Sequence, residues 1–266
     1  MRWIRWQQIL RLGVHTHVFN NPLRFIDPDG RAPDDIVYYN SSGSEIHRIK
    51  SETVHKSYVA KYSGTNTNAA KTISGLSNIV QSRFFEEAMM PNQIMENGGL
   101  RGYENLDYQV AASTHIFNKK LASSERLPAT EHHQYTENSV LPTSFDVNMV
   151  KAMAIEESDF GQPGPNGTGA SDTLESNYPG DYNSSIDVKK AVGLTKNQTM
   201  NSNTSIQAGL GILLIKGMSS DTSGNYTSWK GLSTALKNYH SGENKSYQNN
   251  IINNTKALQN GTEVDF

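Results

Sequence analysis

The pattern of apolar and polar positions predicts short amphipathic helices separated by long polar loops. The clearest stretch is residues 145–160, FDVNMVKAMAIEESDF, in which Val147, Val150, Met153 and Ala154 recur at helical spacing. Such spacing marks one face of a helix that turns toward a core. Further helices are predicted over residues 53–61, 69–90, 101–122, 188–194, 203–217, 229–239 and 247–258.

Strands are predicted only near the start of the chain. Residues 35–39 (DIVYY) and 45–49 form two short segments joined by the turn sequence Asn-Ser-Ser-Gly. We therefore expect residues 34–100 to be a linker region with small strands and helices. The expected fold class is mainly α: a helical domain with long polar loops, preceded by that small region.

The predicted helix at 145–160 ends on a glutamate with unusual surroundings. At about 100° per residue, Glu157 lies close to the direction of Val150 and Met153. A carboxylate on the apolar side of a helix end costs free energy unless it stays protonated or finds partners. Because glycine-rich polar sequence follows, Glu157 is expected where a buried helix opens into a loop-lined cleft. In such an environment a carboxyl group can serve as a general acid near neutral pH. The alternative is a solvated glutamate, as expected for adjacent Glu156.

Composition and charge exclude several classes of function. The 266 residues allow one large domain, or one domain with a smaller partner. A net charge of −2 with no basic cluster argues against a nucleic-acid partner. The absence of cysteine excludes disulfides, thiolate metal sites and cysteine nucleophiles. The sequence contains no run of about 18 apolar residues, so no membrane span is predicted. The basic N-terminus lacks the apolar core of a signal peptide, so export would require another machine.

Residues 20–33, NNPLRFIDPDGRAP, are by composition a tight-turn linker. The string also resembles the end of the core of RHS-repeat proteins, which are shell-forming polymorphic toxins. In that family, Asn-Pro-Leu and then Phe-Ile-Asp-Pro-x-Gly close the shell before a variable C-terminal toxin. The resemblance implies a secreted effector, of the type VI secretion kind, that meets a cognate immunity protein and the secretion machinery. Self-cleavage, known in some family members, would point to Asp27 or Asp29.

Three motifs in the second half of the chain recur in a known order. Glu-Ser-x-Phe at residues 157–160 is followed by Ser-Ile-x-Ala-Gly at 205–209 and Ala-Leu-x-x-Tyr-x-x-Gly at 235–242. Their order resembles the lysozyme-like domain of soluble lytic transglycosylases and goose-type lysozymes. The two resemblances together divide the chain into an RHS-core remnant, a linker and a lysozyme-like catalytic domain, at residues 1–33, 34–100 and 101–266.

The lysozyme-like resemblance implies cleavage of the MurNAc–GlcNAc glycan strand of peptidoglycan in the periplasm of a target bacterium. Glu157 matches the family's catalytic acid, which protonates the glycosidic oxygen as an oxocarbenium-like transition state forms. Tyr239 matches a family tyrosine that would orient Glu157 or contact the sugar. Both a lytic transglycosylase and a muramidase remain open, as do a non-catalytic cell-wall binding module and a chitinase-type glycosidase.

The chain also departs from the family pattern. The usual Gly-Leu-Met-Gln is replaced by residues 172–175 (DTLE), which puts Glu175 in place of the glutamine. The usual Tyr-Asn-Ala-Gly is replaced by residues 239–242 (YHSG). The extra carboxylate and imidazole would support a hydrolytic route, with Asp172 and Asp181 as further candidates for the base or as loop-stabilising acids. The candidate catalytic residues are Glu157, Glu175 and Tyr239. The candidate substrate-binding residues are Ser158, Asp172, Asp181 and His240.

No metal site or cofactor is predicted. His132 and His133 stand beside Glu131 but lack a third and fourth ligand at defined spacing. His115 lies on a predicted helix, where a partly buried core histidine is the simpler interpretation.

Overall fold

The computed structural model mixes helices and strands, with 45% helix and 20% strand among the described residues. The structure describes residues 34–51, 53–160, 172–177, 182–240 and 245–264. The RHS-like string with Asp27 and Asp29, and the candidate Asp181, lie outside the described residues. No helix in the described ranges combines the length and apolar character that crossing a bilayer requires.

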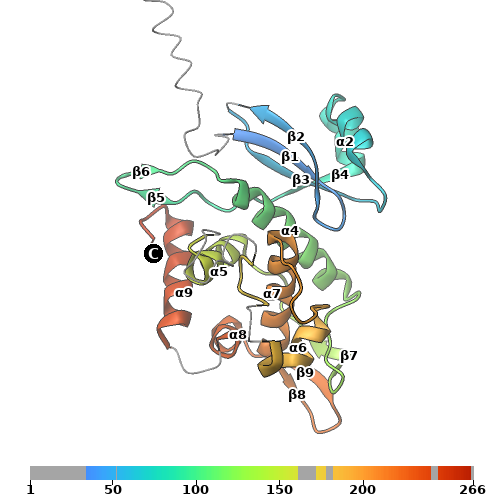
Figure 1. Ribbon diagram of the computed structural model, residues 1–266, viewed down its shortest axis with the longest axis vertical. Helices are drawn as coiled ribbons and strands as arrows, with labels where there is room; N and C mark the ends of the chain where they lie inside the picture. The colour runs from blue at the N-terminus through green and yellow to red at the C-terminus, as the bar shows by residue number, and fades with distance from the viewer. Residues whose placement is uncertain (1–33, 52, 161–171, 178–181, 241–244, 265–266) are drawn as a thin grey trace, which may run out of the picture.

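The first described strand, β1, belongs to a four-stranded sheet (Figure 1). Its strands are β1 (Asp34–Tyr39), β2 (Glu45–Ser51), β3 (Lys56–Ala60) and β4 (Phe85–Ala88), in the order β2-β1-β3-β4. β1 pairs antiparallel with β2 and parallel with β3, and β3 pairs antiparallel with β4. The predicted strands at 35–39 and 45–49 are confirmed.

Both faces of this sheet are covered. Val37 and Tyr39 pack with Tyr108 of α4 (Asn105–Ser123). Tyr38, which points the other way because side chains alternate along a strand, packs with Ala70 of α2 (Thr67–Ser74). The short helix α3 (Asn78–Phe84) leads directly into β4. Helix α4 lies between this sheet and the helices of the second half of the chain (Figure 1). Its side chains therefore contribute both to the core under the sheet and to the larger core among those helices.

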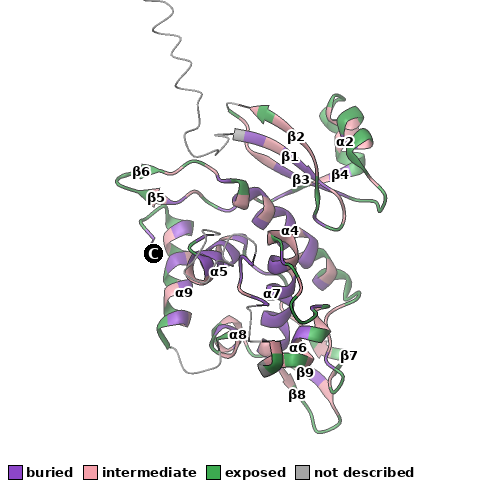
Figure 2. Cartoon of the chain, viewed as in Figure 1, coloured by how far each residue is buried: buried purple, intermediate pink, exposed green. Residues whose placement is uncertain are grey.

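The larger core lies on the other side of α4. It is built from α5 (Val147–Ser158), α7 (Ser202–Gly217), α8 (Leu232–Tyr239) and α9 (Lys245–Asn260). Helices α5 and α7 are buried on almost all sides and occupy its centre (Figure 2). A 3-10 helix (Tyr182–Ser185) and α6 (Ile186–Ala191) lie outside α7.

Two smaller sheets complete the described fold. A three-stranded sheet has the order β7-β9-β8 and is formed by β7 (Gln134–Val140), β8 (Met218–Ser220) and β9 (Asn225–Trp229). β7 and β9 run parallel although about 90 residues separate them in the chain. The hairpin of β5 (Met95–Glu96) and β6 (Gly99–Leu100) lies near the C-terminal end of α9 (Figure 1).

The prediction of a mainly α, lysozyme-like helical fold is wrong, because three sheets are present in the described residues. The helix predicted at 53–61 is strand β3, whose burial alternates along the strand. The helix predicted at 69–90 is α2 and α3 followed by β4. Strand β7 lies between the helices predicted at 101–122 and 145–160, where no strand was predicted. It was missed because its mostly exposed, polar residues carry no apolar period.

A buried ion pair joins α4 to α5. Lys151 and Asp107 are almost inaccessible to solvent, and the Lys151 Nζ lies 2.6 Å from Oδ1 of Asp107. The same ammonium donates to the Asn92 carbonyl oxygen at 3.0 Å and lies over the Phe160 ring. The other oxygen of Asp107 accepts from the Glu104 backbone N–H at 2.9 Å, which caps α4. One pair of charges therefore positions two helices.

Lys151→Met is expected to lower the free energy of unfolding by about 3–5 kcal/mol, because it leaves the Asp107 carboxylate buried without its counter-charge. Urea denaturation measures the change. The double variant with Asp107→Asn should recover a substantial part of the loss, and the exposed-site control Lys71→Met should change little. A loss below about 1 kcal/mol for Lys151→Met would show that the pair does not hold the helices together.

Candidate active site

Glu157 lies in the last turn of α5, where the chain changes direction abruptly. Asp159 and Phe160 both adopt left-handed backbone conformations, with φ of +48° and +55°. Their backbone N–H groups donate to the carbonyl oxygens of Ile155 and Ala154, at 3.0 and 2.9 Å, and close the helix end. The helix therefore ends at Ser158, one residue after Glu157, and the glutamate stays at the edge of the core.

A tyrosine from another helix contacts this carboxyl group. Tyr247, in the first turn of α9, donates its hydroxyl hydrogen bond to Oε1 of Glu157. Its ring is buried and packs against the ring of His240, with centroids 4.6 Å apart. Burial raises the pKa of Tyr247 well above 10, so the phenol stays protonated and remains a donor.

The carboxyl group of Glu157 retains a proton near neutral pH. Burial raises its pKa to about 8 and outweighs the hydrogen bond from Tyr247, which lowers it. The negative charges of Glu175, Glu156 and Asp172 act in the same direction as burial. So does the negative end of the α5 dipole. Although the residue as a whole is partly exposed, the carboxyl group is desolvated enough to act as an acid at pH 7.

The segment 172–177 folds around one buried carboxylate. Asp172 accepts hydrogen bonds from the backbone N–H groups of Ser176 and Asn177, at 2.9 and 2.8 Å. Its Oδ1 also accepts from the hydroxyls of Ser176 and of Ser205 on α7, at 3.1 and 2.7 Å. With four donors on two oxygens, Asp172 organises the loop and attaches it to α7.

Three further hydrogen bonds attach the same segment to α5, α7 and α8. Ser158 donates to the Thr173 carbonyl oxygen at 2.9 Å, and the Leu174 N–H donates to the Ser205 hydroxyl at 2.9 Å. The Tyr239 hydroxyl donates to the Leu174 carbonyl oxygen at 2.8 Å. The segment is thus held from three directions.

This anchoring presents Glu175 toward the end of α5. Glu175 has a φ of +44°, a conformation that a residue other than glycine rarely adopts. Burial raises the pKa of its carboxyl group, the charge of Asp172 raises it further, and His240 lowers it. Because Glu175 also raises the pKa of Glu157, the two carboxyl groups share one electrostatic environment.

The structure brings together most of the site residues that the sequence suggested. Glu175 and Asp172 raise the pKa of Glu157, and His240 lowers that of Glu175. Ser158 and Tyr239 hold the loop that carries Asp172 and Glu175. The hydroxyl that contacts Glu157 comes from Tyr247, which sequence reasoning missed. Its only sequence signal is an aromatic residue at the start of an amphipathic helix, and core aromatics show the same pattern.

Two of the histidines considered in the sequence analysis contact other side chains. His133 Nδ1 lies 3.3 Å from the Thr130 hydroxyl, and its ring stacks on Tyr226. His115 Nε2 lies 3.0 Å from a carboxylate oxygen of Glu86. Within the described ranges, no group of three or more His, Cys, Asp or Glu side chains is arranged to hold a metal ion.

Asp172→Ala is expected to lower the free energy of unfolding by about 2–4 kcal/mol, because it leaves several buried donors without an acceptor. Glu175→Gln, three residues after Asp172 in the same segment but outside that hydrogen-bond cluster, should change it by less than about 1 kcal/mol. Urea denaturation of the two variants side by side measures the difference. Equal stability of both variants would contradict the structural role of Asp172.

Comparisons of the chain with protein-family models, with curated proteins and with solved structures found no match. The functional proposal therefore rests on the geometry around Glu157 and on the motifs of the sequence.

Proposed function

We propose that the chain cleaves the MurNAc–GlcNAc glycan strand of peptidoglycan, with Glu157 as the general acid. The observation that carries this proposal is the desolvated carboxyl group of Glu157, whose pKa is raised to about 8 and which accepts a hydrogen bond from Tyr247. A general acid must hold a proton at the working pH and release it to a leaving group. Burial keeps the proton on Glu157, and the hydroxyl of Tyr247 supports its release by stabilising the carboxylate.

In the proposed reaction, Glu157 donates its proton to the glycosidic oxygen as the bond to the anomeric carbon breaks. Positive charge develops on the sugar as an oxocarbenium-like transition state forms. The carboxylate left on Glu157 is stabilised by the hydroxyl of Tyr247. The interaction is therefore stronger after proton transfer than before it, which is the condition for a catalytic contribution.

The second carboxyl group favours hydrolysis over transglycosylation. A hydrolase that inverts the anomeric carbon needs a base for the attacking water, and Glu175 is coupled to Glu157 through their charges. Asp172 is less suited to that task, because four hydrogen-bond donors already occupy its oxygens. In a transglycosylase, Glu157 alone would accept the proton of the sugar's own hydroxyl.

The choice of peptidoglycan rests on sequence motifs. The three motifs at residues 157–160, 205–209 and 235–242 occur in the order found in peptidoglycan-cleaving transglycosylases and lysozymes. The string at residues 20–33 resembles the segment that precedes RHS toxins. We therefore propose a secreted antibacterial effector that acts in the periplasm of a target cell and is neutralised there by a cognate immunity protein.

Glu157→Gln is expected to reduce the release of muropeptides from purified sacculi by about 10²–10⁴-fold, because the amide cannot donate the required proton. Mass spectrometry of the wild-type digest identifies the reaction: reducing ends mean a muramidase and anhydro ends mean a transglycosylase. Purified chitin digested in parallel tests the other glycan. Sacculi bound by the wild-type chain without release of fragments would instead identify a cell-wall binding module.

The melting temperature of Glu157→Gln provides the control for its loss of activity. Between pH 4.5 and about 8 the folded chain holds the Glu157 proton that the unfolded chain releases, so stability falls as pH rises through this window. Glu157→Gln removes that dependence, and its melting temperature should equal or exceed that of the wild type at pH 8. A melting temperature well below the wild-type value would mean that lost activity reflects lost folding.

Tyr247→Phe is expected to lower activity and to move the alkaline limb of the pH profile to higher pH. The hydroxyl of Tyr247 lowers the pKa of Glu157, so its removal lets burial raise that pKa above about 8. Rates measured from pH 5 to pH 10 give the shift. The exposed-site control Tyr62→Phe should leave the profile unchanged. An unshifted alkaline limb in Tyr247→Phe would assign that limb to another group.

A further inference from the structure

A cavity lies on the other side of α7 from the candidate active site. On the side of the candidate active site, a Cβ atom added at Gly209 would lie 2.7 Å from Cδ1 of Leu174. At Gly211 it would instead lie 2.7 Å from Cγ1 of Val192, in the wall of a cavity of about 630 Å³. Two residues along a helix correspond to a rotation of about 200°. Helix α7 therefore separates the cavity from the candidate active site.

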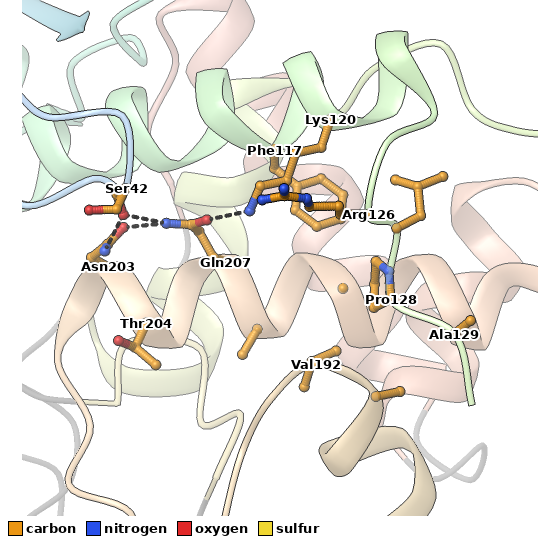
Figure 3. Close-up of a pocket in the computed structure, with 14 residues that line it drawn as sticks. Ser42, Phe117, Lys120, Arg126, Pro128, Ala129, Val192, Asn203, Thr204 and Gln207 are labelled. Atoms are coloured by element: carbon orange, nitrogen blue, oxygen red, sulfur yellow. Dashed lines mark hydrogen bonds between the residues drawn. The ribbon is translucent and has the colours of Figure 1, made fainter. Parts of the chain in front are cut away.

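Two cationic side chains from neighbouring segments line this cavity. Lys120 comes from the last turns of α4, and Arg126 follows that helix. Their charged ends lie close together (Figure 3). Burial lowers the pKa of Lys120, and the charge of Arg126 lowers it further. Within the part of the chain that the structure describes, no carboxylate forms an ion pair with either side chain. Two adjacent cations repel each other, and a bound anion would offset that repulsion.

A chain of hydrogen bonds holds the lysine in place. Lys120 Nζ donates to Oε1 of Gln207 at 3.0 Å. The Gln207 amide nitrogen donates to Oδ1 of Asn203 at 2.6 Å and to the Ser42 carbonyl oxygen at 3.1 Å (Figure 3). Asn203 Nδ2 donates to that same carbonyl oxygen at 2.9 Å. The turn between β1 and β2 thus fixes Gln207, and Gln207 directs the ammonium group.

The arginine is placed by an unusual backbone. Ser124 and Arg126 both have left-handed conformations, with φ of +52° and +53°, which residues other than glycine seldom adopt. This turn brings Arg126 back toward Lys120 on α4 (Figure 3). Strained conformations are often kept at ligand sites, where they orient a binding group.

The remaining walls of the cavity are apolar. Phe117, Pro128 and Val192 line it beside the two cations. The volume lies within the range of small-molecule sites, which combine apolar walls with a few placed polar groups. A ligand that fits carries an anionic group at one end and an apolar part at the other.

We propose that this cavity binds a small ligand through an oxyanion, a carboxylate or a phosphate. The planar guanidinium of Arg126 matches the geometry of either group, and the ammonium of Lys120 adds a second charge-assisted hydrogen bond. The amide nitrogen of Gln207 is already committed to Asn203 and Ser42, so the anion rests on the two cations. The site is independent of the chemistry proposed for Glu157.

The test is titration calorimetry of the full chain with inorganic phosphate and, separately, with acetate, at an ionic strength held constant with sodium chloride. Saturable binding of at least one anion is expected. Arg126→Met and Lys120→Met should each weaken it by about tenfold or more, the loss of one charge-assisted hydrogen bond. The control Lys71→Met, an exposed lysine on α2, should bind as the wild type does.

The two anions distinguish the chemistry of the natural ligand. Tighter binding of phosphate points to a phosphorylated ligand, and tighter binding of acetate to a carboxylate. Arg126 is exposed, so Arg126→Met should keep the wild-type melting temperature and its binding defect can be attributed to the site. No saturable binding of either anion by the wild type would overturn the proposal, as would unchanged binding in a folded Arg126→Met.

Discussion

The burial of α5 is the constraint on which the rest of the structure depends. The helix is enclosed over nearly its whole length, so each polar side chain on it needs a partner from elsewhere in the fold. Lys151 finds the Asp107 carboxylate on α4, and Ser158 finds the Thr173 carbonyl oxygen. Glu157 finds the Tyr247 hydroxyl on α9. These partners draw three other segments of the chain around one helix.

The same constraint explains how the segment beside Glu157 is held in place. The segment 172–177 has no regular secondary structure of its own beyond turns, yet hydrogen bonds from α5, α7 and α8 hold it. Its organiser is the buried carboxylate of Asp172, and its neighbour Glu175 stands in a strained conformation near Glu157. Carboxyl groups gathered in a poorly solvated place repel one another, and this repulsion helps to keep a proton on Glu157.

Helix α7 gives the molecule two different faces. Its glycines allow close approach on both sides: Leu174 and Tyr239 pack at Gly209, and Val192 and Pro128 pack at Gly211. One face supports an acidic site and the other a cationic cavity. A single buried helix without large side chains at these positions therefore separates two regions of opposite charge.

The sequence alone determined the helices with a strong apolar period and the residue at the centre of the site. Helices α4, α5, α7 and α9 and the hairpin of β1 and β2 follow from local patterns, and Glu157 follows from its place on the apolar side of α5. Glu175 and His240 were suggested by departures from the motifs of the family that the sequence resembles. Local pattern and motif together therefore suggested the acid and its charged neighbours.

Only the tertiary structure decided the fold class and the partner of the acid. Strand β3 forms because β1 and β4 pair with it, and strand β7 forms because β9 pairs with it. Neither sequence has an apolar period that distinguishes a strand from a helix or a loop. Tyr247 lies 90 residues beyond Glu157 in the chain, and only the packing of α9 on α5 brings them together. Lys120 is likewise oriented by Gln207 on α7, 87 residues away in the chain. Contacts between residues far apart in sequence leave no local pattern, and for that reason the sheets, the tyrosine and the cationic cavity were visible only in three dimensions.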